Sequence, residues 1–251
     1  MKKCVVSILL WVWLAPAAHA NLALTGYSTA GPLSTQERIW IQEGKMRRDF
    51  VDRGRAFTHL FDLGKRQVAL IDHVARQIEL HDLESLHAST EVGGPSGAIK
   101  LDLTPTGETR MLRHWNCQAH TLAASMPTRL GQEDTVLHLG GKVWIARNTP
   151  EQFAVNKLVE LARQRDFFFG IPATVRATPA QARMLSELVR ELAPRGLPCG
   201  GEISARFEGS GPMATLAQRL PARLGLSIQD FSTAPLRPEL FALPHGYAVR
   251  R

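Results

Sequence analysis

The segment from Ile39 to Phe50 reads IWIQEGKMRRDF and predicts a β-hairpin. Apolar and polar residues alternate on both sides of Glu43-Gly44, which is the pattern of two strands joined by a two-residue loop. That loop fixes which residues face each other across the hairpin. The expected pairs are Ile41 with Met46, Trp40 with Arg47, and Arg38 with Asp49.

The two faces of this hairpin differ in character. Side chains alternate along a strand, so one face combines a Trp–Arg contact with an Arg–Asp pair. The other face is apolar except for Arg48, which shares it. A guanidinium there must reach the edge of the sheet or meet an anion, because an unpaired buried charge is costly. The apolar residues of this second face are Ile39, Ile41, Met46 and Phe50.

Similar alternation continues from residue 21 to about residue 147 and predicts a β-meander. Turns are expected at Gly64-Lys65, near Val74-Ala75 and at Pro105-Thr106-Gly107, and residues 91–97 read as a loop. Phe57 and Phe61 alternate with polar residues and extend the apolar surface. Each strand has a single apolar face, so the sheet is expected to be antiparallel and to need a cover on one side only.

Residues 148–196 predict that cover. Two segments, Thr149-Pro150-Glu151-Gln152 and Thr178-Pro179-Ala180-Gln181, combine a threonine cap, a proline at the first helical position and a glutamine that completes a capping box. Gly196 and Pro198 are expected to end the second helix. Apolar stripes behind the two starts predict packing on the sheet. They comprise Ala154, Leu158, Leu161 and Ala162, and then Ala182, Leu185, Leu188, Val189 and Leu192.

The rest of the chain, residues 197–251, reads as one or two returning strands and a proline-rich tail, with residues 213–224 compatible with either helix or strand. The predicted fold class is therefore α+β. We expect one domain over residues 21–251, in which a curved antiparallel sheet is covered by two or more helices.

The first twenty residues predict export. Lys2 and Lys3 precede an apolar run, and the segment ends in the small-x-small pattern that signal peptidase accepts, so cleavage is expected between Ala20 and Asn21. About ten apolar residues are too few to span a bilayer. The mature chain is expected to be soluble and periplasmic. It keeps 28 lysines and arginines against 23 acids, a net charge of +5.

Most of these cations are arginines, which grip phosphate and carboxylate groups as a fork. Contact with an anionic membrane surface is one interpretation, and a soluble basic surface is the other. Nucleic acid is not expected as a partner, because no recognisable binding motif is present.

Export favours a disulfide between the two remaining cysteines, Cys117 and Cys199. A competing interpretation is a metal site, because Cys117 stands between His114 and His120 at the spacing H-x2-C-x2-H. In an extended strand the cysteine would face away from both histidines, and no fourth ligand is evident. We therefore predict the disulfide, with no metal and no cofactor.

Catalytic motifs are not evident in the sequence. It contains no G-x-S-x-G, no H-E-x-x-H and no phosphate-binding loop. The protein is therefore not expected to be an enzyme.

Several short segments together resemble a known family. They are Gly44-Lys45-Met46-Arg47-Arg48-Asp49, Asp62-Leu63-Gly64-Lys65-Arg66-Gln67, Thr106-Gly107-Glu108-Thr109-Arg110 leading to Cys117, Lys142-Val143-Trp144-Ile145-Ala146, and residues 238–247, PELFALPHGY. Their order resembles the bacterial domain-of-unknown-function family forty-four-twelve. The chain departs from that pattern at His114-Trp115 and His120. The resemblance implies a half-barrel similar to those of the periplasmic lipoprotein carriers LolA and LolB.

Two functions remain open at this point. In the first, the half-barrel holds an acyl chain, a lipid or a lipoprotein, with Arg48 at the rim for an acidic headgroup. In the second, sheet and helices fill each other, and the protein is an envelope module that binds other proteins. The candidate lining residues of the first hypothesis are Ile39, Ile41, Met46, Arg48, Phe50, Phe57 and Phe61.

Overall fold

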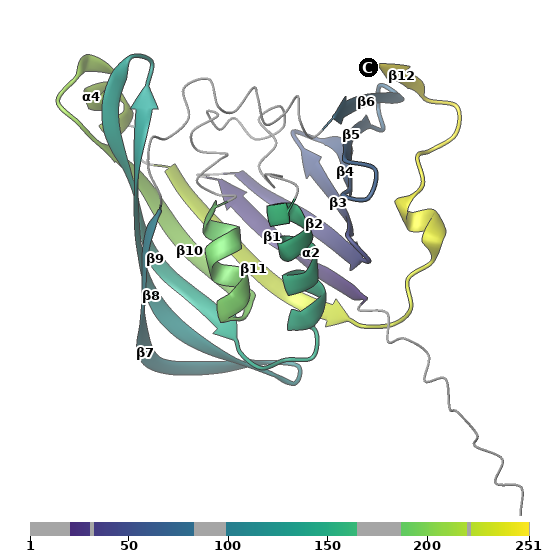
Figure 1. Cartoon of the computed structure of the whole chain (residues 1–251), viewed down its shortest axis with the longest axis horizontal. Helices are drawn as coiled ribbons and strands as arrows, with labels where there is room; N and C mark the ends of the chain where they lie inside the picture. Colours follow the sequence, from purple (N-terminus) through teal and green to yellow (C-terminus); the bar gives the residue numbers. More distant parts are fainter. Residues whose placement is uncertain (1–20, 31–32, 83–98, 165–186, 220–221, 251) are drawn as a thin grey trace, which may run out of the picture.

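The computed structural model contains the 251-residue chain and describes residues 21–30, 33–82, 99–164, 187–219 and 222–250. One twelve-stranded sheet dominates it, in the order β12-β6-β5-β4-β3-β2-β1-β11-β10-β9-β8-β7. The sheet is curled but open, with β12 at one edge and β7 at the other (Figure 1). All neighbouring strands are antiparallel except β12 and β6.

The predicted meander over residues 21–147 is two separate meanders. The first runs through β1 (Leu22–Ala30), β2 (Leu33–Gln42), β3 (Lys45–Asp52), β4 (Arg55–Asp62), β5 (Gln67–Asp72) and β6 (Gln77–Asp82). The second runs through β7 (Lys100–Leu112), β8 (Trp115–Leu130), β9 (Glu133–Ala146), β10 (Leu197–Glu208) and β11 (Ala222–Ser232). Pairing of β1 with β11 joins them, so the two strands predicted to return do so in the middle of the sheet.

The hairpin of β2 and β3 has the predicted register. Ile41 pairs with Met46, Trp40 with Arg47 and Arg38 with Asp49. Glu43 and Gly44 adopt φ values of 48° and 77°, and a type I′ loop requires positive φ at both central positions. A Cβ at Gly44 would also lie 2.9 Å from Leu161 Cδ1. The glycine therefore serves both the turn and the close approach of a helix.

Two helical segments cover one side of the sheet, as predicted (Figure 1). Helix α2 (Gln152–Gln164) buries Ala154, Leu158 and Ala162 against strands of the first meander. Residues 187–192 are helical and pack Leu188 and Leu192 against strands of the second meander. The helix passes through the short 3-10 turn η1 (Ala193–Arg195) and ends before Gly196, as expected.

Two details of the helix prediction are wrong. The Thr149 hydroxyl is buried and has no hydrogen-bond partner, so it does not cap α2; the first turn is instead held by backbone hydrogen bonds. Val189 is exposed rather than part of the buried stripe. It faces away from the sheet, whereas Leu188 and Leu192 face toward it. The predicted helix start at residues 178–181, with Ala182 and Leu185, lies outside the described residues.

Residues 105–107 do not form the predicted turn. They lie inside β7, where a bulge between Pro105 and Thr109 shifts the pairing with β8. Gly107 has a φ of 83°, so the glycine accommodates the bulge instead of reversing the chain. The ambiguous segment after β10 resolves into helix α4 (Pro212–Gln218) followed by β11.

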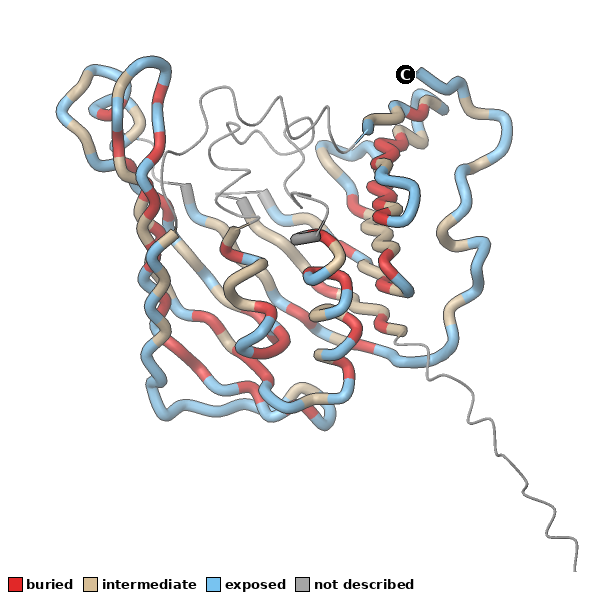
Figure 2. The backbone as a smooth tube through the Cα atoms, in the orientation of Figure 1, coloured by how far each residue is buried: buried red, intermediate tan, exposed pale blue. Residues whose placement is uncertain are grey.

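The C-terminal strap, residues 233–250, crosses the outside of the first meander. It contains the 3-10 turn η2 (Pro238–Phe241) and β12 (Ala248–Arg250), which pairs with β6. Phe241 and Tyr247 pack on the buried side chains Leu60, Ala69, Ile71 and Ile78. Figure 2 shows that the strap itself is largely exposed, whereas the strands that it contacts contain runs of buried residues.

The disulfide between Cys117 and Cys199 is present. Cys117 lies on β8 and Cys199 on β10, with Cα atoms 6.2 Å apart, so the bond crosses the intervening strand β9. Cys117 is bonded to Cys199 and is therefore not available as the thiolate ligand of the competing metal interpretation. The described part of the chain contains no group of three or more potential metal ligands. His114 contacts Glu151, and His120 contacts Gln118 O and Arg147.

Across the described ranges, no helix has the length and apolar character needed to cross a membrane.

Candidate functional site

The inner face of the first meander, which is the face toward α2, carries the seven predicted lining residues. The structure divides them into two groups. Ile39, Ile41, Met46 and Phe61 belong to the core cluster that contains Leu158 and its neighbours on α2. Arg48, Phe50 and Phe57 lie further along β3 and β4 and are not part of that cluster. The helix therefore fills the first half of the predicted lining and leaves the second half as the candidate site.

An ion pair between a buried carboxylate and a partly exposed guanidinium forms the centre of this second half. Glu37 on β2 is almost fully buried and accepts a hydrogen bond from Arg48 Nε on β3 over 3.0 Å. A second hydrogen bond joins Arg48 Nη2 to the other carboxylate oxygen, and Ser28 Oγ on β1 donates to that same oxygen. Arg48 thus meets an anion, as its place on an apolar face requires, and this anion belongs to the protein.

His59 lies beside the ion pair, directly opposite Arg48 in the pairing of β3 with β4. Its ring meets Phe50 edge-on at 4.7 Å between centroids and Phe61 edge-on at 6.3 Å. Burial, followed by the positive charge of Arg48, lowers the pKa of His59 from 6.5 to about 3. The imidazole is therefore neutral at physiological pH.

Aromatic rings form the wall around these polar groups. Phe50 stacks on Phe57 with 5.7 Å between ring centroids, and the guanidinium of Arg48 lies 4.9 Å from the centroid of Phe50. A cation over an aromatic face is attracted by the ring's negative quadrupole. The wall thus both shields and holds the arginine.

Two hydrogen-bonding positions remain unused in the site. Arg48 uses Nε and Nη2 for Glu37, which leaves Nη1 without a partner among the described residues. His59 Nε2 is buried and has no hydrogen-bond partner either. A buried nitrogen such as His59 Nε2 is costly to leave unpaired, whereas the Arg48 side chain is partly exposed, so water can reach it. A bound polar group would satisfy both positions. Arg48 Nη1 can donate to an anion, and His59 Nε2 can donate or accept according to its tautomer.

Glu37 and His59 were not predicted as site residues, although the sequence contained the signal. Glu37 alternates with Ile39 and Ile41, so it shares their face of β2. His59 stands between Phe57 and Phe61 in the same way on β4. Strand alternation alone would have placed both residues beside Arg48.

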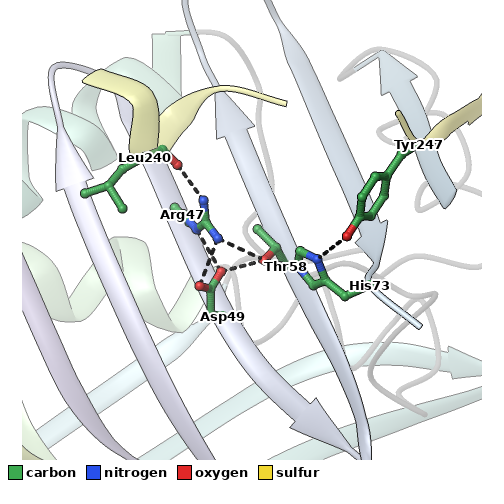
Figure 3. Close-up of polar contacts among 6 residues, drawn as sticks. All are labelled: Arg47, Asp49, Thr58, His73, Leu240 and Tyr247. Carbon is green, nitrogen blue, oxygen red and sulfur yellow. Dashed lines mark hydrogen bonds and ion pairs between the residues drawn. The ribbon is translucent and has the colours of Figure 1, made fainter. Parts of the chain in front are cut away.

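The outer face of the same strands carries a different polar network (Figure 3). Arg47 donates to both carboxylate oxygens of Asp49, over 2.8 and 3.0 Å, and to Leu240 O in the strap over 2.8 Å. Thr58 Oγ1 donates to Asp49 Oδ1 over 2.6 Å and lies 2.8 Å from His73 Nε2. His73 Nδ1 lies 3.1 Å from the hydroxyl of Tyr247.

This network attaches the strap to β3 and β4. Arg47 also lies 5.7 Å from the ring centroid of Trp40, so the predicted Trp–Arg contact is present. The predicted Arg38–Asp49 pairing holds in the strand register, but the carboxylate of Asp49 bonds to Arg47. Every polar group that Figure 3 shows has a partner within the protein, so the outer network is structural.

Comparison with known proteins gives no relative from which a role could be transferred: no family model matches the chain, and no curated protein is similar to it.

Proposed function

We propose that this chain is an exported, non-catalytic binding protein of the cell envelope, and that the Arg48 site holds the acidic end of an acyl ligand. The observation that carries the proposal is the unused donor of Arg48 next to the unpartnered Nε2 of His59, within an aromatic wall. An acyl carboxylate would accept from both groups, while its chain would contact Phe50 and Phe57. Burial of such apolar contacts would supply most of the affinity.

The proposal includes three expectations from the sequence. Residues 1–20 act as a cleaved signal, the mature chain works in the periplasm, and the fold belongs with the LolA-like half-barrels that the family resemblance implies. An open, curled sheet with helices on one face supports the last of these. A lipid or lipoprotein is the corresponding ligand class.

The first experiment asks whether the protein carries a lipid. Purified mature protein is extracted with organic solvent, and the extract is examined by mass spectrometry. We expect an acidic lipid at a stoichiometry approaching one. An empty extract, together with no binding of added dodecanoate, would contradict the proposal.

The second experiment tests the role of Arg48. Binding of dodecanoate and of uncharged dodecanol is titrated at two salt concentrations for wild type, Arg48→Lys and Arg48→Ala. Because one charge-assisted hydrogen bond is at stake, each substitution should weaken dodecanoate binding by roughly tenfold and leave dodecanol binding little changed. Arg48→Lys keeps the charge beside Glu37 and so guards against a simple folding defect.

Arg38→Ala is the matched control, because Arg38 is exposed on the neighbouring strand. It removes the same charge from the protein without touching the site, so its affinity for dodecanoate should equal that of wild type. Equal losses in Arg38→Ala and Arg48→Ala would mean that general surface charge attracts the anion.

A protein-interaction module without a small ligand is the second candidate. Two observations favour it: α2 fills half of the predicted lining, and Glu37 already neutralises Arg48. In that case neither titration shows binding, and affinity purification with the mature protein recovers a partner whose binding is unaffected by Arg48→Lys.

A further inference from the structure

A groove of about 700 Å³ lies on the outer face of the second meander, far along the sheet from Arg48. Its floor consists of three small residues in one row across neighbouring strands, Ala123 on β8, Gly140 on β9 and Ser204 on β10. These residues alternate with Ala124, Leu139 and Ala205, which face the helical cover. The groove therefore opens on the side opposite the helices.

Longer side chains form the wall beside this floor. The next row of paired residues contains Lys100 on β7, Ser125 on β8, His138 on β9 and Arg206 on β10. Asp102 continues the floor row at the β7 edge. The hollow thus results from a row of mostly small side chains next to a row in which Lys100, His138 and Arg206 are long.

The fold does not require a glycine at position 140. Its φ is outside the left-handed region, and the nearest atom to an added Cβ would be Leu122 O at 3.9 Å, which is ordinary contact. Gly141 is the opposite case, since a Cβ there would lie 2.0 Å from Glu202 O. Glycine inside a strand weakens the strand and often marks a place where a ligand or another backbone approaches. Gly140 fits that description, whereas Gly141 is explained by strand packing.

The charges around the groove indicate what approaches. Lys100 and Arg206 are exposed, and neither has an ion-pair partner within the described ranges. They stand at opposite ends of their row, about 14 Å apart at the usual spacing of four neighbouring strands. The two cations therefore suit a ligand with spaced negative charges that is longer than a single phosphate.

The uncharged part of the ligand is constrained by the remaining lining. Ser125 offers a hydroxyl, Ser204 Oγ donates to Gly140 O over 3.1 Å and can still accept, and Asp102 offers a carboxylate that accepts hydrogen bonds from hydroxyl groups. A ligand with negative charge along its whole length, such as a polyacidic peptide, would place charge against Asp102. In an acidic saccharide each carboxylate is one substituent of a ring that also bears hydroxyls, so hydroxyls can face Asp102 while carboxylates face the two cations. The flat floor accommodates a sugar ring.

We propose that the groove on β7–β10 binds an acidic saccharide, with Lys100 and Arg206 on its charged groups and the bare floor at Gly140 beneath a ring. This site is independent of the Arg48 site, so either proposal can fail without the other.

The test titrates trigalacturonate, uncharged maltotriose and tetraglutamate into the mature protein by calorimetry. The proteins compared are wild type, Gly140→Thr, Lys100→Ala and Arg206→Ala. We expect wild type to bind trigalacturonate in preference to the other two probes. Each cation variant should bind trigalacturonate roughly tenfold more weakly, the effect of one lost charge-assisted contact.

Gly140→Thr is the decisive variant. Threonine favours strands and has room at this position, so the melting temperature should stay the same or rise while trigalacturonate binding is lost. Arg250→Ala is the matched charge control, because this exposed residue lies on β12 at the other edge of the sheet. It should bind like wild type.

Several results would overturn the proposal. One is wild-type affinity in Gly140→Thr, and another is an Arg250→Ala loss as large as that of Arg206→Ala. Absence of trigalacturonate binding by wild type would also do so. Equal binding of tetraglutamate would show that the groove takes acidic polymers in general and would reject the saccharide.

Discussion

Arg47 and Arg48 are neighbours on β3, and their surroundings differ completely. Arg47 faces outward, where a carboxylate, a backbone carbonyl and a threonine hydroxyl use its donors. Arg48 faces inward, where one buried carboxylate uses two of its nitrogens and Nη1 has no partner among the described residues. The outer arginine holds the protein's own C-terminal strap, whereas the inner arginine has hydrogen-bonding capacity left.

The contrast between the two arginines gives a criterion for separating a structural charge from a functional one on a single strand. Both arginines belong to the same sequence motif, and composition cannot distinguish them. The number of donors that are paired within the protein distinguishes them, because all three side-chain nitrogens of Arg47 have partners, whereas Arg48 leaves Nη1 for water or a ligand. Four predictions test the distinction, beginning with the largest expected effect.

Glu37→Gln should lower the free energy of unfolding by about 3 kcal/mol, because it leaves the guanidinium of Arg48 without its buried counter-ion. Urea unfolding followed by circular dichroism measures the change. Glu202→Gln, an exposed change on β10, should unfold like wild type. A loss below 1 kcal/mol in Glu37→Gln would show that Arg48 is well solvated, which would remove the basis for a buried anion site.

Acid should destabilise the inner face through His59. The unfolded state takes up a proton near the ordinary pKa of 6.5, but the folded state does so only at about 3, so stability is full above pH 6.5 and falls below it. The loss attributable to His59 should reach about 2.5 kcal/mol by pH 4.5. Urea unfolding of wild type and His59→Leu between pH 7 and 4.5 measures the difference in slope.

The exposed residue His245 supplies the control for this pH series. His245→Asn should keep the wild-type slope, because it changes an exposed side chain in the strap and leaves the inner face intact. A wild-type slope in His59→Leu would mean that His59 is protonated in the native protein at pH 4.5.

Arg47→Ala should lower the free energy of unfolding by about 2 kcal/mol, because Leu240 O loses its donor and Asp49 keeps only the hydrogen bond from Thr58. The strap should then be cut faster by protease. Dodecanoate binding should remain at the wild-type level, in contrast to Arg48→Lys. Weakened binding in Arg47→Ala with an unchanged strap would reverse the roles assigned to the two arginines.

Tyr247→Phe should have the smallest effect, about 1 kcal/mol, since it removes only the hydroxyl that contacts His73 and keeps the ring packed on the outer face. Hydrogen exchange of the backbone amide of Ala248, which donates to Arg76 O, reports on the strap directly. Faster exchange there with unchanged exchange in β2 is the expected result. Equal protection in both proteins would show that His73 does not help to hold the strap.

Local patterns predicted much of this fold, because strand alternation and turn chemistry are local. Glu43-Gly44 fixed the register of β2 with β3, and the same alternation could have identified Glu37 and His59. Pro105-Thr106-Gly107 misled because proline and glycine serve a bulge as readily as a turn, and only the neighbouring strand distinguishes the two. Thr149 misled because a cap depends on the orientation of a single hydroxyl.

The contacts of the strap were out of reach of sequence reasoning. Residues 238–247 of the strap were noticed only as part of the family resemblance. Their contact with β3 could not be predicted, because Arg47 and Leu240 are 193 positions apart in the sequence. No periodicity links positions so distant. The groove at Gly140 was missed for a related reason, since one empty position becomes a groove only when the strands on both sides also carry small residues.

Pairing of β12 with β6 has a consequence for how molecules of this protein behave toward each other. An uncovered edge strand offers a row of free amides and carbonyls on which a second molecule can add its own strand, and such additions can continue into fibres. At one edge of the sheet, residues 248–250 pair with Gln77, Ile78 and Glu79 of β6. At the other edge, the bulge at Pro105 interrupts the regular strand β7. The last few residues of the chain therefore help to keep a long open sheet from polymerising.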